Sequence, residues 1–155
     1  MARSTTAAPA ATRVKSPSLT IADASRAEGT TGTSNMAFTV KLSKAWTTPV
    51  TVKYETVNGT ATAGSDYVAS SGTLTFAAGE TAKSVTVGVI GDTTVESNET
   101  FKVKMSNPLG ATISRTRAIG TIVNDDTTPV VPTLSIPDAS KAEGGMKVMH
   151  IMSSA

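Results

Sequence analysis

The chain has 155 residues, of which 14 are Lys or Arg, 12 are Asp or Glu, one is His and none is Cys. This length allows one ordinary domain with tails. Without cysteine there is no disulfide framework, thiol nucleophile or cysteine-based zinc site, and one histidine cannot build a multi-histidine metal site. No apolar run approaches the roughly 18 residues of a membrane span. A net charge of +2 is too small to indicate nucleic-acid binding.

Strand signals follow one another at regular intervals along the chain. Aromatic residues make up only 4% of it, whereas the β-branched residues Thr and Val are abundant, which favours strands over helices. Alternating apolar residues mark seven strands, in chain order at 19–21, 38–42, 50–54, 74–76, 85–89, 101–105 and 117–123. Seven such strands predict an all-β fold in which two antiparallel sheets form a sandwich.

Two local signals qualify this pattern. Asp23-Ala24-Ser25 favours a turn or bulge within the first, edge strand. Asn58-Gly59 is a strong signal for a tight hairpin. Such a hairpin would add a short strand and reverse the direction of the strands that follow.

The sequence divides into a leader, a domain and the start of a second copy. Residues 1–16 carry three basic groups and no acid, which predicts a flexible leader that lacks the apolar segment of a secretory signal, although transit peptides share its composition. Residues 17–126 hold nine basic and ten acidic groups and form the predicted domain. Residues 17–29 recur as 132–144 with nine of thirteen positions identical. Residues 127–155 are therefore predicted to be a linker and the truncated start of a second repeat.

Most acids of the domain fall in connections that share one end of the predicted sandwich. If consecutive strands are antiparallel, the connections after the first, third and fifth strands and the exit of the seventh lie at the same pole. They contain seven of the ten acids: Glu28, Asp66, Asp92, Glu96, Glu99, Asp125 and Asp126. Such a cluster repels itself unless a cation or a basic partner compensates it, and carboxylates without His or Cys suit Ca²⁺. The alternative is that acids simply favour loops.

Several ordered motifs between residues 17 and 126 resemble the Calx-beta domain. They are the stretches 58–67 (NGTATAGSDY), 71–81 (SGTLTFAAGET), 89–92 (VIGD), 96–101 (ESNETF), 106–108 (SNP) and 122–126 (IVNDD). The resemblance implies a seven-stranded, immunoglobulin-like antiparallel β-sandwich. Such domains occur in the regulatory regions of sodium–calcium exchangers and in large bacterial surface proteins.

In the calcium-binding members of this family the ions lie at one pole, and the resemblance carries the ligand role over to the same seven acids. Two positions differ from the exchanger pattern: Gly91 replaces an additional Asp, and Asn124 replaces the first acid of the closing triplet. Fewer carboxylates predict one or two ions, with dissociation constants on the order of 10⁻⁴–10⁻³ M. Other members of the family use these acids only as hydrogen-bond acceptors in loops.

Three further features have alternative interpretations. Trp46 lies in a turn at the opposite, basic pole, where it either contacts a partner or packs over the edge of the core. His150, among three methionines, either binds a soft metal or is incidental. Lys102 and Lys104 alternate with core residues and mark a solvated face. No motif of a catalytic site is present, so we expect no enzyme activity.

The favoured function is a non-catalytic calcium-binding module with a structural or adhesive role in a surface-exposed bacterial or viral protein, located outside the cell, on the cell surface or on a virion. Two alternatives remain: an assembly subunit of a virion, fibre or filament that contacts its neighbours through tails ordered by partners, and a module that binds a glycan or protein receptor. The expected partners are neighbouring repeats or further copies of the chain. Nucleic acid and membrane insertion are not expected.

Overall fold

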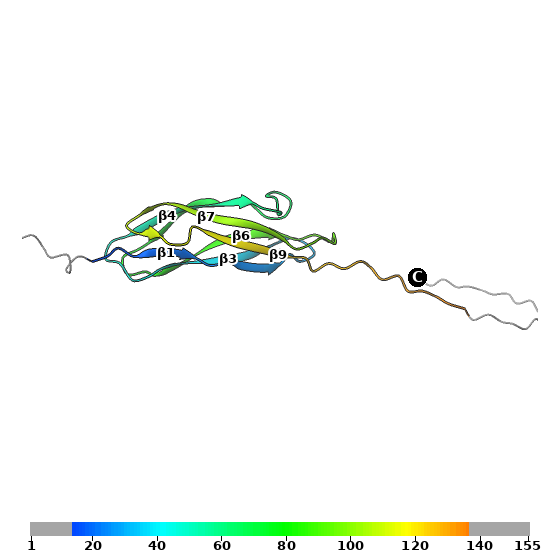
Figure 1. Ribbon diagram of the computed structural model, residues 1–155. Helices are drawn as coiled ribbons and strands as arrows, with labels where there is room; N and C mark the ends of the chain where they lie inside the picture. The colour runs from blue at the N-terminus through cyan, green and yellow to red at the C-terminus, as the bar shows by residue number, and fades with distance from the viewer. Residues whose placement is uncertain (1–13, 137–155) are drawn as a thin grey trace, which may run out of the picture.

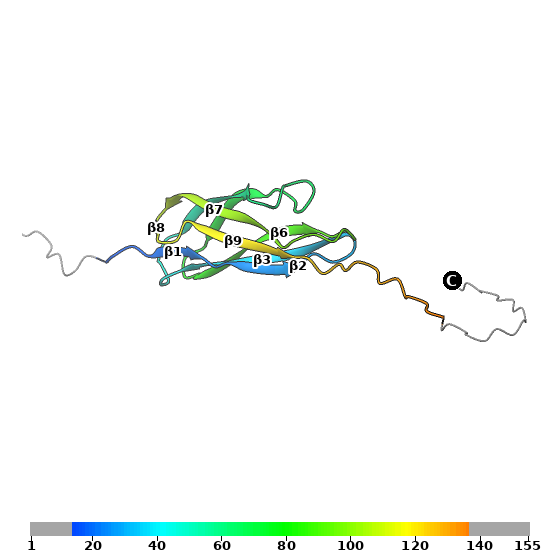
Figure 2. The same cartoon turned by 45° about the vertical axis from the view of Figure 1, so that its right-hand side comes forward.

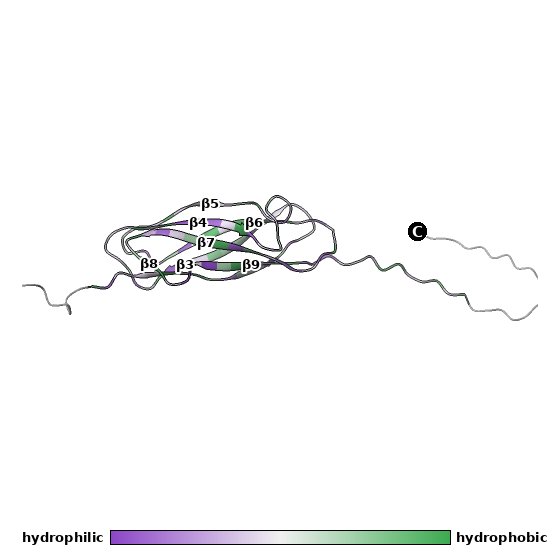
Figure 3. Ribbon diagram, turned by 45° about the horizontal axis from the view of Figure 1, so that its top comes forward, coloured by the Kyte–Doolittle hydropathy of each residue, from purple (hydrophilic) through white to green (hydrophobic). Residues whose placement is uncertain are grey.

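Alternation of buried and exposed residues along the strands produces two sheets that bury one apolar core between them (Figures 1 and 3). The computed structural model describes residues 14–136. Its elements are β1 (Ser18–Ile21), β2 (Ala24–Ala27), β3 (Thr33–Leu42), β4 (Val50–Asn58), β5 (Ser71–Phe76), β6 (Ala82–Ile90), β7 (Glu99–Leu109), β8 (Thr112–Ile113) and β9 (Arg117–Val123). The described part of the chain is therefore an all-β sandwich without helices, as predicted, and it contains no helix that could cross a membrane.

The two sheets have the strand orders β6-β3-β1-β8 and β2-β9-β7-β4-β5. Residues 14–136 form nine strands rather than seven, because two short strands are added to the predicted ones: β2 directly after the first predicted strand, and β8 before the last, whose predicted range 117–123 is confirmed as β9. The chain changes sheets at the predicted break near Asp23: β1 pairs with β3 in one sheet, and β2 crosses to the other sheet and pairs with β9. The β1–β8 and β2–β9 pairs are parallel, whereas the prediction was an antiparallel sandwich throughout.

Asp23 stabilises the point where the chain changes sheets. Its Oδ1 accepts hydrogen bonds from the backbone N–H of Ile119, at 2.7 Å, and from Nη2 of Arg115, at 2.6 Å. One carboxylate thus holds the β1–β2 crossover against the start of β9 and the segment before it.

Three aromatic rings occupy the centre of the core. Phe101 packs edge-on against Phe38 at a centroid distance of 5.8 Å and stacks on Tyr67 at 4.2 Å. Tyr67 is only 1% exposed although it lies outside the strands, in the connection between β4 and β5. The stack therefore fixes this long connection to the core.

The Asn58-Gly59 pair does not form the tight hairpin that its sequence favours. Its side-chain oxygen instead caps the connection, because Asn58 Oδ1 accepts hydrogen bonds from Ala63 N–H and from the Tyr67 hydroxyl. A side chain at position 59 would collide with the backbone carbonyl of Thr100, so the close approach to β7 requires glycine. No strand is added, and β5 remains antiparallel to β4.

The chain enters the sandwich at one end and leaves it at the other (Figures 1 and 2). β9 ends at Val123, and residues 124–136 continue from that end without strand or helix. Leu134 and Ile136, which correspond to the buried Leu19 and Ile21 of β1, are 76% and 63% exposed. The leader up to residue 13 and the segment after residue 136, including His150, lie outside the described residues.

Candidate metal centre

The seven predicted acids come from four separate segments of the chain that meet at the end of the sandwich where β9 ends. We call this group the acidic pole. Glu28 follows β2, and Asp66 lies in the β4–β5 connection. Asp92 and Glu96 lie between β6 and β7, Glu99 begins β7, and Asp125 and Asp126 follow β9.

Parallel pairing of β2 with β9 places Glu28 beside the exit of β9. Ala27 is in register with Val123, and the Glu28 N–H donates to the Val123 carbonyl at 3.0 Å. Because parallel strands run in the same direction, the residues that follow them emerge side by side. The sheet change near Asp23 is therefore what brings Glu28 to Asp126.

The structure brings six of the seven acids into two groups of three. In one group are Glu28, Asp92 and Asp126; in the other are Asp66, Glu96 and Glu99. Within each group, one carboxylate oxygen from every residue lies within 4.8 Å of the others. Asp125 belongs to neither group; its Oδ1 accepts a hydrogen bond from the Gly29 N–H at 3.2 Å.

Burial and repulsion between neighbouring carboxylates raise the pKa of three acids of the pole. Glu28 is 6% exposed, and burial followed by the charges of Asp92 and Asp126 raises its pKa from 4.5 to about 7, with smaller effects from two further acids. Burial, followed by nearby carboxylates, also raises the pKa of Glu99 and of Asp126. Asp92 and Glu96 act on both Glu28 and Glu99, so the two groups form one electrostatic unit.

Protein groups satisfy only part of the oxygen atoms in the acidic pole. Asp66 and Asp92 each accept one backbone N–H, from Thr62 at 2.7 Å and from Thr94 at 2.6 Å. The Oδ2 of Asp126 is buried and has no hydrogen-bond partner in the described part of the chain. Within residues 14–136, no Lys or Arg forms an ion pair with any of the seven acids. An unpartnered buried carboxylate oxygen among repelling carboxylates has the chemistry of a site for a hard divalent cation.

The two neutral positions in the predicted ligand pattern have structural roles. A Cβ at Gly91 would lie 2.7 Å from the carbonyl oxygens of both Glu28 and Gly29, so the backbone packing leaves no room for a side chain there. Asn124 accepts the Glu96 N–H at 3.1 Å, and its amide donates to the Asp126 carbonyl at 2.9 Å. It therefore ties the β6–β7 connection to the exit of β9.

Sequence reasoning missed the residues that position the acids. Asn98 accepts the Asn124 N–H at 3.0 Å, and Tyr67 anchors the connection that carries Asp66. The role of Tyr67 could have been predicted, because an aromatic residue directly after the predicted ligand Asp66 can anchor its connection to the core. The partners of Asn98 are distant in sequence, and no periodic pattern marks them.

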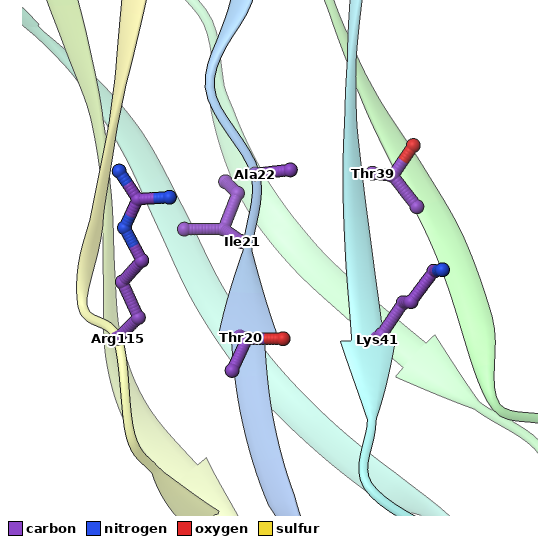
Figure 4. A pocket seen from close by; sticks show the side chains of 6 residues that line it. All are labelled: Thr20, Ile21, Ala22, Thr39, Lys41 and Arg115. Carbon is purple, nitrogen blue, oxygen red and sulfur yellow. The ribbon is translucent and has the colours of Figure 1, made fainter.

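Trp46 and a hollow on the four-stranded sheet lie away from the acidic pole. Trp46 is partly buried, and the Lys44 ammonium lies 5.3 Å from the centroid of its ring. Of the two interpretations of Trp46, the structure therefore shows the one in which it packs over the edge of the core. A hollow of about 210 Å³ lies on the outer face of the four-stranded sheet. Figure 4 shows six side chains that line it. Its walls include Lys41 and Arg115, and the Arg115 guanidinium is already bound to Asp23.

Fold and acidic pole together define a β-sandwich module whose strand connections gather carboxylates at the end where the last strand exits. The chain belongs to the Calx-beta domain family, whose model matches residues 19–127. The Calx-beta domain is a non-catalytic module.

Known proteins resemble part of this chain. Sodium/calcium exchanger 1 of Canis lupus familiaris is 48% identical over 61 residues, which are 39% of this chain and 6% of the exchanger. Sodium/calcium exchanger 2 of Rattus norvegicus is 48% identical over 56 residues, 36% of this chain and 6% of that protein. The similarity thus spans only a small part of these relatives.

Solved structures share the fold. The crystal structure of the apo-form Calx CBD1 domain matches with a TM-score of 0.61 and 26% identity, and the match covers 72% of this chain and 100% of that one. The crystal structure of the calcium binding domain CBD12 of CALX1.1 matches with a TM-score of 0.62 and 26% identity, over 70% of this chain and 46% of that one.

Proposed function

We propose that this Calx-beta domain is a non-catalytic module that binds Ca²⁺ at the acidic pole. The observation that carries the proposal is the unpartnered, buried Oδ2 of Asp126 within a group of carboxylates that no cation of the described chain compensates. Calcium favours several carboxylate and carbonyl oxygens in a flexible arrangement, which the two groups of three acids offer. The likeness to a calcium binding domain of CALX1.1 supports the same ion.

Each residue of the pole has a proposed part in holding the ion. Glu28, Asp92 and Asp126 would hold one ion, and Asp66, Glu96 and Glu99 a second or a shared one. Asp125 would contribute less, because its Oδ1 already accepts a backbone N–H. A bound cation would neutralise the repulsion between the carboxylates. It would also hold the β4–β5 connection, the β6–β7 connection, the end of β2 and the exit of β9 together as one rigid end.

The test is thermal unfolding of the full chain in EDTA, in Mg²⁺ and in Ca²⁺. With a dissociation constant between 10⁻⁴ and 10⁻³ M, 10 mM Ca²⁺ should stabilise the fold by about 1.4 to 2.7 kcal/mol. Asp126→Asn should remove this effect. Glu55→Gln, which removes one carboxylate from β4 and away from the pole, should keep it. Equal unfolding temperatures of the wild type in all three solutions would contradict the proposal and leave the acids only as hydrogen-bond acceptors within the loops.

We further propose that the module serves a structural role in a longer extracellular, cell-surface or virion-surface protein. The recurrence of residues 17–29 as 132–144 supports a tandem arrangement of repeats. Residues 17–126 would form one repeat, and residues 127–155 a linker and the start of the next. The partners of each module would then be its neighbouring repeats. The acidic pole lies where this linker begins, so calcium would stiffen the joint. Small-angle X-ray scattering of a two-repeat chain with and without Ca²⁺ tests this; unchanged scattering would contradict it.

Assembly through the tail is the second candidate function, and the exposure of Leu134 and Ile136 favours it. These residues repeat the strand that β1 forms, and their apolar side chains lie open to solvent. A strand of this kind can add to a sheet edge of another copy. Deleting residues 127–155 should then abolish oligomers in size-exclusion chromatography, and an unchanged profile would refute it.

A further inference from the structure

The outer face of the five-stranded sheet carries a group of cations that does not belong to the acidic pole. Lys102 and Lys104 of β7, Arg117 of β9 and Val57 of β4 line a hollow of about 170 Å³. All three cationic residues are exposed. We call this surface the basic face.

The strand register sets like charges against one another on the basic face. Lys104 pairs directly with Arg117 across the β7–β9 ladder, and cross-strand pairs of like charge are destabilising. Glu55 is in register with Lys104 on the other side, yet no ion pair forms between them. The ion pairs within residues 14–136 are Lys83–Glu80 and Arg115–Asp23, so the cations of the hollow have no carboxylate partner there.

The basic face also exposes apolar side chains beside these charges. Ile119 is paired with Lys102 and is 42% exposed, and Val57, paired with Lys102 from the other side, is 39% exposed. Apolar patches flanked by free cations suit a ligand that presents anionic groups next to apolar ring faces. Residues 17–126 have ten acids against nine bases, so attraction for an anion here is a property of this face and not of the whole domain.

We propose that the basic face binds an anionic polysaccharide, with sulfate or carboxylate groups on Lys102, Lys104 and Arg117 and sugar rings over Val57 and Ile119. β4, β7 and β9 are interior strands with a neighbour on each side, so their backbone groups are already paired. A peptide cannot add to them as a further strand, and recognition must use side chains alone. Nucleic acid fits less well, because the hollow presents no aromatic ring for base stacking.

The hollow in Figure 4 provides a matched comparison. It lies on the outer face of the other sheet, and of its two cationic residues only Lys41 is free of an ion pair within residues 14–136. The control variant is Lys41→Gln/Lys15→Gln, which removes two cations that form no ion pair within residues 14–136 and lowers the net charge by the same amount as the test variant Lys102→Gln/Lys104→Gln.

The experiment measures binding of the full chain to heparin, polygalacturonate, neutral dextran and polyglutamate in EDTA, so that the acidic pole holds no calcium. We expect binding to heparin or polygalacturonate but not to dextran. The test variant should bind about tenfold more weakly, with the slope of log K against log salt reduced by about 2, because two charge contacts are lost. The control variant should bind like the wild type, and unfolding curves of both variants should confirm that they fold.

Three results would overturn the proposal: no binding to either anionic polysaccharide, an equal loss in test and control variants, or polyglutamate binding as tightly as the polysaccharides. The last would assign the basic face to acidic proteins. A preference for heparin over polygalacturonate would assign it to sulfate groups, and the reverse to carboxylates. None of these results depends on whether the acidic pole binds calcium.

Discussion

Replacing Glu28 by Gln is expected to stabilise the calcium-free protein at pH 8 while abolishing its response to calcium. Burial and four neighbouring carboxylates raise the pKa of Glu28 from 4.5 to about 7. Between these values the folded carboxyl holds a proton that the unfolded carboxyl has released. The free energy of unfolding therefore falls as the pH rises through this window, and it is greatest below the unfolded pKa.

The size of this effect follows from the two pKa values. The difference between 7 and 4.5 corresponds to about 3 kcal/mol, at about 1.4 kcal/mol for each pH unit. Gln has nearly the same volume and carries no charge, so it should recover most of this energy at pH 8. For a domain of this size, that is a rise of about 10 °C in the unfolding temperature.

The assay is thermal unfolding in EDTA at pH 5 and pH 8, for the wild type, Glu28→Gln and the control Glu55→Gln. The wild type and the control should both lose stability at pH 8, and Glu28→Gln should lose less. Some pH dependence should remain, because the pKa values of Glu99 and Asp126 are also raised. A Glu28→Gln protein that is no more stable than the wild type at pH 8 would refute the reasoning.

Three further substitutions test how the acidic pole is built. Gly91→Asp should destabilise the fold rather than add a ligand, because its Cβ would lie 2.7 Å from two backbone carbonyl oxygens; a tighter affinity for Ca²⁺ in calorimetry at unchanged stability would contradict this. Asp23→Ala should lower the free energy of unfolding by about 1 to 2 kcal/mol in urea titrations, because two hydrogen bonds at the sheet crossover are lost. Tyr67→Phe keeps the ring stack but removes the hydroxyl that donates to Asn58, so urea titrations should show a loss of about 1 kcal/mol; an unchanged midpoint would assign the anchoring to the ring alone.

Strand periodicity was sufficient to predict the sandwich, but it could not show that the first strand serves both sheets. The alternation at Leu19 and Ile21 marked β1, and the turn signal at Asp23 marked the break after it. The parallel pairing of β2 with β9 depends on contacts between residues almost a hundred positions apart. No local pattern encodes such pairing, and the strand-parity argument assumed antiparallel neighbours throughout.

The candidate site shows the same limit at single residues. The seven acids could be selected from sequence because they fall in alternate connections, and the structure places six of them in groups of three. The Asn58-Gly59 pair suggested a hairpin because turn propensity reflects only the local backbone conformation. In the structure its amide caps a longer connection, and its glycine makes room for β7. Local turn propensity was outweighed by packing that involves Thr100 and Tyr67.

The parallel β2–β9 pair has a mechanical consequence. β2 lies near the start of the domain and β9 at its end, and the chain enters and leaves at opposite poles. A pulling force along the chain therefore loads the hydrogen bonds between these strands in shear, so that the four paired positions from Ala24 to Ala27 must yield together instead of opening one at a time. In a series of such modules under tension, the β2–β9 pairing would determine how long each module resists unfolding.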